Sequence, residues 1–178
     1  PDRVLMFGST SKISLAGAGV AMLAASKTNI DDALEKMFVS TIGPDKINQL
    51  RHVRFFGDVA GIAVHMDKLA AILAPKFAVV DEILEHRLGG KGIATWTKPE
   101  AGYFVSVDVL DGCAADVVRL AGEAGVKLVP AGATFPYGKD PNDRNICLAP
   151  TMPAVDDIRH AMDIFCTCVE LAAVNKLR

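Results

Sequence analysis

The sequence lacks the features that direct a protein to nucleic acid or to a membrane. Its 178 residues hold 19 Lys and Arg against 21 Asp and Glu, and a net charge of −2 offers no basic surface for a polyanion. Apolar runs are short: the run that contains Met22 and Leu23 stops at Ser26, far below the length that crosses a bilayer. We therefore expect neither nucleic acid nor a membrane as a partner.

Cysteine is scarce, and its spacing does not favour a metal site. The cysteines are Cys113, Cys147, Cys166 and Cys168. The last two are separated by one residue within a helical pattern, so they face different sides of the helix and cannot clamp one ion together. We expect no metal, and we expect reduced cysteines that act as small apolar residues in a cytoplasmic protein.

From its opening residues we also expect no secretory signal. The sequence opens with Pro1-Asp2-Arg3, without the basic and apolar stretches of a secretory signal, and it starts without methionine at an expected strand. We interpret it as the C-terminal part of a longer protein. Its 51% hydrophobic and 22% charged residues are typical of a chain that folds around a core.

The first half predicts two strands around a Gly- and Ser-rich loop, followed by three helices. We expect the strands at 4–8 and 20–26 and the helices at 29–40, 45–56 and 59–88. Asn29 and Asp45 are expected to cap the first two helices. Pro75 lies inside the third and predicts a kink or a break near Ala74.

The second half predicts a small sheet covered by helices on one face, an α+β layer. Strands are expected at 95–97, 103–107, 126–129 and 145–149, and helices at 112–124 and from 153 onward. The last helix carries one apolar stripe, formed by Val155, Ile158, Met162, Phe165 and Val169.

Lys12 has the most distinctive surroundings in the sequence. It follows the first expected strand in the run Gly8-Ser9-Thr10-Ser11-Lys12, and glycines come soon after it. A lysine amine at a strand end can form a Schiff base with an aldehyde, while hydroxyls and exposed backbone N–H groups hold a phosphate. Taken alone, however, such a lysine is more often a solvated surface residue.

Four segments in the same order make the chain resemble the class I aminotransferases, the fold-type I enzymes that use pyridoxal 5′-phosphate. These segments are Ser9–Lys12 with Ala16-Gly17, Lys98–Phe104, Gly125–Phe135 and Asn145–Pro150. The first segment and the run 43–52 look closest to a branch of bacterial aspartate aminotransferase-like proteins that is related to MocR-type regulators.

The resemblance implies an α/β fold, the C-terminal part of a fold-type I transferase that depends on pyridoxal phosphate. Residues 1–58 would complete the large cofactor-binding domain with its mixed sheet, residues 59–88 would form a long interdomain helix, and residues 89–178 would form the α+β small domain. It also implies a homodimer that moves an amino group between an α-amino acid, with aspartate or glutamate favoured, and a 2-oxo acid.

The same resemblance implies roles for single residues. Lys12 would be the catalytic lysine, which binds the cofactor covalently and then moves a proton between carbon atoms, for which its amine must be neutral. Ser9 matches the serine that holds the cofactor phosphate, and Ser11 is a second candidate for that contact.

The sequence departs from the family at two places. Ala16-Gly17-Ala18-Gly19 stands where the family has a phosphate-binding arginine, and Cys147 stands where it has the arginine that grips the substrate carboxylate. Arg144 lies at an odd offset from Cys147, so it would face the other side of a strand unless the backbone bulges. Cys147 and the start of the sequence favour an alternative, a non-catalytic sensor domain as in MocR-type regulators, and a lyase or decarboxylase on the same fold is a third possibility.

Overall fold

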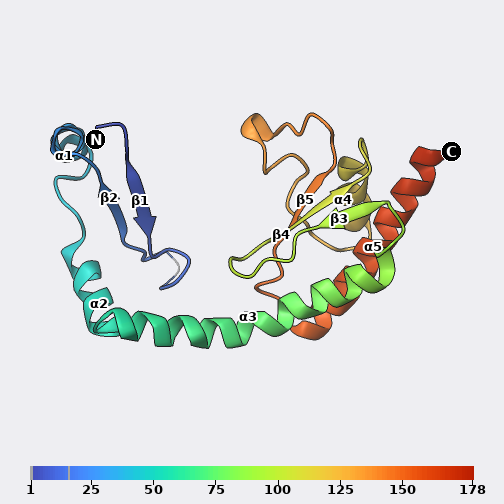
Figure 1. Cartoon of the computed structure of the whole chain (residues 1–178), viewed down its shortest axis with the longest axis horizontal. Helices are drawn as coiled ribbons and strands as arrows, with labels where there is room; N and C mark the ends of the chain where they lie inside the picture. Colours follow the sequence, from blue (N-terminus) through green and yellow to red (C-terminus); the bar gives the residue numbers. More distant parts are fainter. Residues whose placement is uncertain (1, 16) are drawn as a thin grey trace. The chain divides into compact units, whose positions relative to one another are not determined.

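The computed structural model describes residues 2–15 and 17–178, and the chain separates into two compact units, 1–70 and 71–178. Helix α3 (Val59–Leu88) crosses the boundary, so each unit contains part of it. Figure 1 shows the elements in chain order. No helix within the described ranges is both long and apolar enough to cross a membrane.

The first unit begins with a hairpin. Strand β1 (Met6–Ser9) pairs antiparallel with strand β2 (Ala21–Ala24), and the pair Ser9↔Ala21 closes the ladder next to the connecting loop. Both expected strands are present, although each is shorter than the pattern predicted.

Two helices follow the hairpin, α1 (Lys27–Thr41) and α2 (Lys46–Phe56). Asp45 caps α2 as predicted, because its side chain accepts from the N–H of Asn48. The expected cap of α1 was wrong: Ser26 is the cap and accepts from the N–H of Asn29, so the helix starts earlier. Serine and asparagine are both favoured at the N-cap of a helix. In the structure Ser26, which lies closer to β2, occupies this position.

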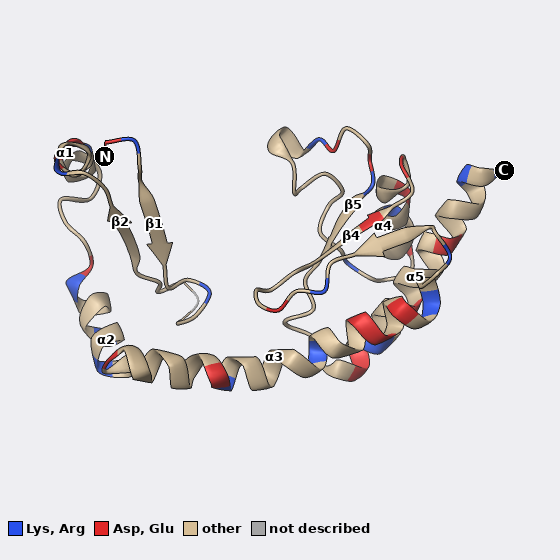
Figure 2. Cartoon of the chain, viewed as in Figure 1, with Lys and Arg blue, Asp and Glu red and all other residues tan. Residues whose placement is uncertain are grey.

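The first unit contains almost no buried residue. Among residues 2–15 and 17–70, Asn48 alone is buried, and β1 and β2 carry no charged side chain (Figure 2). Large apolar side chains are exposed on both strands, including Phe7 at 79% and Met22 at 57%. This unit therefore has no apolar core of its own.

The second unit is built on a three-stranded antiparallel sheet. Its strands are β3 (Ala94–Trp96), β4 (Val105–Val109) and β5 (Asn145–Leu148), in the order β3-β4-β5. Successive side chains of β4 point to opposite faces of the sheet, so Val105, Val107 and Val109 are buried and the residues between them are partly exposed. The sheet thus has one apolar face and one polar face.

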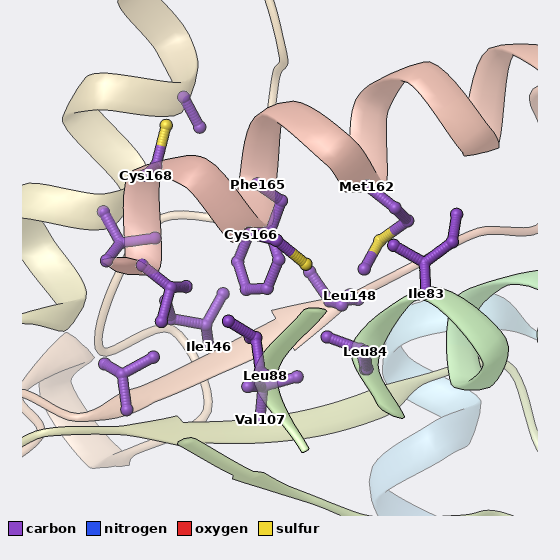
Figure 3. Packing of buried hydrophobic residues seen from close by; sticks show 14 of the residues in the cluster. Ile83, Leu84, Leu88, Val107, Ile146, Leu148, Met162, Phe165, Cys166 and Cys168 are labelled. Atoms are coloured by element: carbon purple, nitrogen blue, oxygen red, sulfur yellow. The ribbon is translucent and has the colours of Figure 1, made fainter. Parts of the chain in front are cut away.

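Helices cover the apolar face and complete the core. Phe165 and its neighbours on α5 (Val155–Leu177) gather with Leu84 and Leu88 of α3 and with Val107 and Ile146 of the sheet (Figure 3). Helix α4 (Ala114–Glu123) contributes Ala114, Val117 and Ala121 to the same cluster. The apolar stripe predicted on the last helix is confirmed, since Ile158, Met162, Phe165 and Val169 are buried.

Two expectations about the second unit differ from the structure. Residues 126–129 were expected to form a strand, but they pair with no other strand. The N–H of Val126 instead donates to the carbonyl oxygen of Ala121 near the end of α4, so it is not available for a sheet. Of the two outcomes predicted at Pro75, a kink or a break, the break is absent, because helix α3 continues through this residue. A proline removes one helical hydrogen bond, but its fixed φ suits a helix, and here the flanking turns are maintained.

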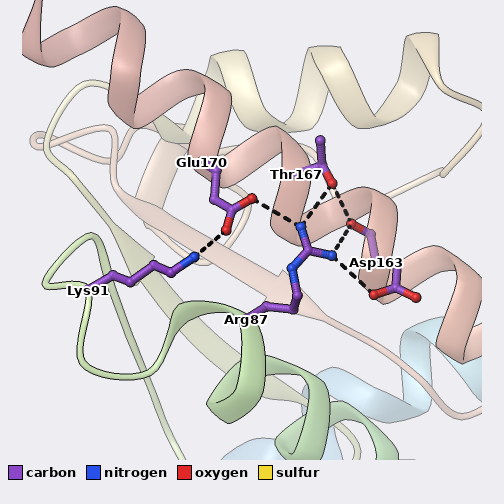
Figure 4. A network of polar contacts seen from close by, with 5 residues as sticks. All are labelled: Arg87, Lys91, Asp163, Thr167 and Glu170. Atoms are coloured by element: carbon purple, nitrogen blue, oxygen red, sulfur yellow. Dashed lines mark hydrogen bonds and ion pairs between the residues drawn. The ribbon is translucent and has the colours of Figure 1, made fainter.

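Charged side chains join the end of α3 to α5. The guanidinium of Arg87 contacts Asp163 at 3.1 Å, Thr167 at 3.2 Å and Glu170 at 3.0 Å, and Lys91 reaches Glu170 at 2.6 Å (Figure 4). Bands of both charges lie on these helix surfaces in Figure 2. The network fixes the two helices over the sheet.

Candidate active site

Lys12 lies in the loop that joins β1 to β2. The backbone closes this loop at Thr10, whose N–H donates to Val20 O at 2.9 Å and whose carbonyl oxygen accepts from the N–H groups of Ile13 and Ser14. Lys12 therefore sits inside one tight turn directly after β1, as its place after the first strand predicted. Its side chain is exposed.

Two serine hydroxyls lie close together beside this turn. Ser9 Oγ is 2.7 Å from Ser11 Oγ, and Ser9 Oγ also accepts from the N–H of Ser11 at 3.1 Å. Gly19 packs directly against Ser11, since a Cβ at this position would lie 2.6 Å from Ser11 Oγ. The two exposed hydroxyls, next to the backbone of Gly19, which has no side chain, form a small polar surface that can hold a phosphate.

Two residues of α2 reach the same loop. His52 Nε2 lies 2.8 Å from Ser14 Oγ and 3.1 Å from Thr10 Oγ1, and Asn48 Nδ2 donates to Ala18 O at 2.7 Å. From the sequence, Asn48 with Gln49 was equally consistent with a site lining and with a solvated helix face, and His52 was left undecided. The contacts became visible only in the folded chain.

Behind the loop lies an open, mainly apolar hollow of about 380 Å³. Its lining comes from the Lys12 loop, from α2 and from the start of α3, and includes Thr10, Ile13, His52, Phe56 and Ile62. The rings of His52 and Phe56 are 6.0 Å apart, and Phe56 also meets His65 edge to face.

Cys147 and Arg144 belong to the second unit. Cys147 lies on β5 opposite Ser106 of β4, on the face of the sheet that points away from the core. It is half-buried, and this burial raises the pKa of its thiol. It also lines a hollow of about 140 Å³ that includes Lys127 and Pro150.

Arg144 directly precedes β5, and its guanidinium lies beside two carboxylates. Nε is 3.6 Å from Asp108 Oδ2, and Nη1 is 3.9 Å from Asp111 Oδ1. Asp140 holds the backbone here by accepting from the N–H groups of Asn145, Arg144 and Asn142, contacts that lower the pKa of its carboxyl group. Arg144 is thus part of a local ionic arrangement at the start of β5.

The structure groups the predicted residues in two sets. Ser9, Ser11 and Lys12 lie together in one turn of the first unit, with His52 and Asn48 added by the fold. Cys147 and Arg144 form a separate set on the sheet of the second unit.

Comparison with known proteins connects this arrangement to one family. Residues 1–178 match the model of the family described as aspartate amino-transferase. An aminotransferase-like protein of Mycolicibacterium smegmatis is 53% identical over 99% of this chain and 41% of its own length, and an aspartate aminotransferase of Corynebacterium glutamicum is 49% identical over 98% and 40%.

A solved structure agrees with these relatives. An aspartate transaminase from Corynebacterium glutamicum superposes with a TM-score of 0.96 at 47% identity, covering 100% of this chain and 42% of that protein. The chain therefore spans about two fifths of the length of the relatives that it matches.

Proposed function

The chain belongs to the aspartate amino-transferase family, and we propose that it forms the C-terminal part of an aminotransferase that depends on pyridoxal phosphate. The observation that carries this proposal is Lys12 in a closed turn beside the hydroxyls of Ser9 and Ser11. The reaction would move an amino group between an α-amino acid and a 2-oxo acid. Aspartate or glutamate is favoured, because a relative with 49% identity is named an aspartate aminotransferase.

Pyridoxal phosphate supplies an aldehyde that binds amines covalently and a ring that withdraws electrons from the carbon bound to the amine. Lys12 Nζ would bind the aldehyde carbon with loss of water. With its amine neutral, Lys12 would also serve as the base that accepts a proton from the substrate α-carbon and donates it again.

Ser9 and Ser11 would hold the phosphate. Their hydroxyls are 2.7 Å apart and exposed, so both can turn toward the same anion. Gly19 leaves room for that approach, because any side chain there would collide with Ser11. Backbone N–H groups in the loop, or the hydroxyl of Ser14, would take the place of the arginine that the family has and this sequence lacks.

The substrate carboxylate needs a cation, and Cys147 cannot provide one. Burial raises the pKa of the Cys147 thiol, so this position stays neutral. Arg144 lies between Asp108 and Asp111 and would have to leave both carboxylates to bind a third. We propose that the α-carboxylate is bound weakly or by another arginine of the complete protein.

We also propose the arrangement that the family implies for the complete protein. Residues 1–58 would end the large cofactor domain, 59–88 would form the interdomain helix, and 89–178 would form the small domain of a cytoplasmic homodimer. The exposed apolar strands β1 and β2 favour this arrangement, because they need a cover within a larger domain. The four cysteines are free, as a reducing compartment requires.

One observation favours a second candidate, a non-catalytic sensor domain as in MocR-type regulators. Cys147 removes the bidentate contact through which an arginine holds a carboxylate, and Lys could not replace it either. A sensor could still bind the cofactor through Lys12 while turning over amino acids slowly. A lyase or decarboxylase on the same fold would also retain Lys12.

Borohydride reduction tests the proposal. The complete protein is mixed with pyridoxal phosphate, reduced, digested and mapped by mass spectrometry. We expect the pyridoxyl group on Lys12, and Lys12→Ala should abolish the label along with amino transfer from aspartate to 2-oxoglutarate. Labels distributed over other lysines would contradict the assignment, and a Lys12 label without amino transfer would favour the sensor.

A further inference from the structure

His52 is the residue that connects α2 to the Lys12 turn. Its Nδ1 lies 2.9 Å from the carbonyl oxygen of Asn48. A carbonyl oxygen only accepts, so Nδ1 must carry a proton, and in the neutral ring Nε2 is left as an acceptor. The ring is thereby oriented by its own helix before it meets the loop.

On the other side, Nε2 faces two hydroxyls that flank Lys12. Ser14 Oγ lies 2.8 Å away and Thr10 Oγ1 lies 3.1 Å away. Thr10 Oγ1 also accepts from the N–H of Val20, and the Ser14 hydroxyl donates to Thr10 O at 2.9 Å. The Ser14 proton is thus used within the turn, so the Thr10 hydroxyl is the one that can donate to Nε2. The ring of His52 contacts both ends of the turn.

Asn48 holds the far end of the loop. Its Nδ2 donates to Ala18 O at 2.7 Å and lies 3.3 Å from Gly19 O. It is the one buried residue among the described residues of the first unit. A buried amide with these partners is costly to disturb, and Gly19 is also the residue that packs against Ser11.

We propose that His52 and Asn48 are positioning residues that hold the Lys12 loop from both ends, so that the lysine amine meets the aldehyde of the cofactor in a reactive orientation. This inference rests on the proposed function. Neither residue needs to touch the cofactor, since both act through Thr10, Ser14 and the loop backbone. A displacement of about 1 Å in such a group can slow a reaction about a hundredfold.

The test separates covalent attachment from binding. In the complete protein, the rate at which Lys12 attaches pyridoxal phosphate is followed by absorbance and by borohydride trapping. Binding of pyridoxamine phosphate, which has no aldehyde and forms no bond with lysine, is measured in parallel. We expect His52→Leu and Asn48→Ala to slow attachment about 10- to 100-fold, with the dissociation constant of pyridoxamine phosphate changed by less than about twofold.

Three further variants sharpen the result. His52→Gln retains an oxygen that can accept from the Thr10 hydroxyl and should recover part of the rate. Ser14→Ala removes one of these hydroxyls, and its effect should overlap with that of His52→Leu in the double variant instead of adding to it. His86→Leu makes the same substitution at an exposed position of α3 and should change neither quantity.

The outcomes are distinguishable. Equal losses in attachment and in pyridoxamine phosphate binding would mean that His52 and Asn48 only support the folded structure, and unchanged attachment would mean that they are not needed; either result overturns the inference. Failure of the unsubstituted protein to attach pyridoxal phosphate at Lys12 would instead overturn the proposed function, and the inference with it.

Discussion

At the scale of single residues, Cys147 has the clearest chemical consequence. It lies half-buried on β5, opposite Ser106, with a small hollow at its side. A thiol in this environment stays protonated and cannot pair with a carboxylate. If the complete protein transaminates, this position limits its affinity for α-carboxylates.

Replacing Cys147 with arginine should therefore increase amino-donor efficiency in the complete protein. A bidentate, charge-assisted contact contributes about 1.5–3 kcal/mol, which corresponds to about a tenfold to hundredfold gain in kcat/KM for aspartate. Steady-state kinetics measure this change. Cys147→Lys is the matched control, because it adds the same charge without the planar fork and should give a smaller gain. Kinetics that do not change with Cys147→Arg would show that the carboxylate is held elsewhere.

The cysteines should also differ in reactivity. Burial raises the pKa of Cys166 to about 12, and Cys113 and Cys168 are buried as well, whereas Cys147 is partly exposed. Because the thiolate is the reactive form, a brief treatment of the native protein with iodoacetamide should label Cys147 first and Cys166 last. Peptide mapping by mass spectrometry gives the order. Early labelling of Cys166 would contradict the packing of α5 against the sheet.

At the scale of elements, the ion pairs between α3 and α5 give the small unit a dependence on pH. The hydrogen bond from Lys91, with a second from Arg87, lowers the pKa of Glu170 below 4.5. A carboxyl group whose pKa is lower in the folded state stabilises the fold fully above its unfolded pKa. That contribution disappears as the pH falls through the folded-state value.

The substitution Glu170→Gln should remove this dependence. We expect a loss of about 1 kcal/mol in the free energy of unfolding near neutral pH, where the carboxylate is paired, and almost none at about pH 3. Urea unfolding across this range measures both values. Glu123→Gln, which breaks the exposed pair with Arg119, is the matched control and should cost less. Equal losses for Glu170→Gln at both pH values would show that the pairing contributes little.

At the scale of the whole molecule, the two units should differ in their ability to fold alone. The buried apolar residues that the structure describes all lie between Val79 and Ala173, within the second unit. The first unit exposes large apolar side chains and buries Asn48 alone among its described residues. Stability depends on apolar area removed from water, so the core belongs to one unit.

Separate expression of the two segments tests this difference. Residues 71–178 should show a cooperative thermal transition and dispersed amide resonances, whereas residues 1–70 should show neither and should bind a hydrophobic dye. Phe165→Ala within 71–178 is the internal control. Loss of this ring from the core should cost about 3–5 kcal/mol and abolish the transition. A cooperative transition in residues 1–70 would contradict our account of the first unit.

The sequence by itself determined much of the local structure. Three local features could be predicted from the sequence because they are periodic or positional patterns. They are the cap residue Asp45, the apolar stripe of α5 and the alternation of buried and exposed residues in β4. The order of four motifs also identified the family, and the match over residues 1–178 confirms it. Lys12 could be predicted in this way as a site residue because its hydroxyl neighbours are adjacent in the chain.

Only the tertiary structure decided which distant groups meet. His52 contacts Ser14 across 38 positions of sequence, Arg144 reaches Asp108, and residues 126–129 leave the sheet although their composition favours a strand. Local sequence patterns predict the period of a helix or strand and the residues that cap its ends. They do not predict which side chains far apart in the sequence come into contact, because those contacts depend on how the elements pack.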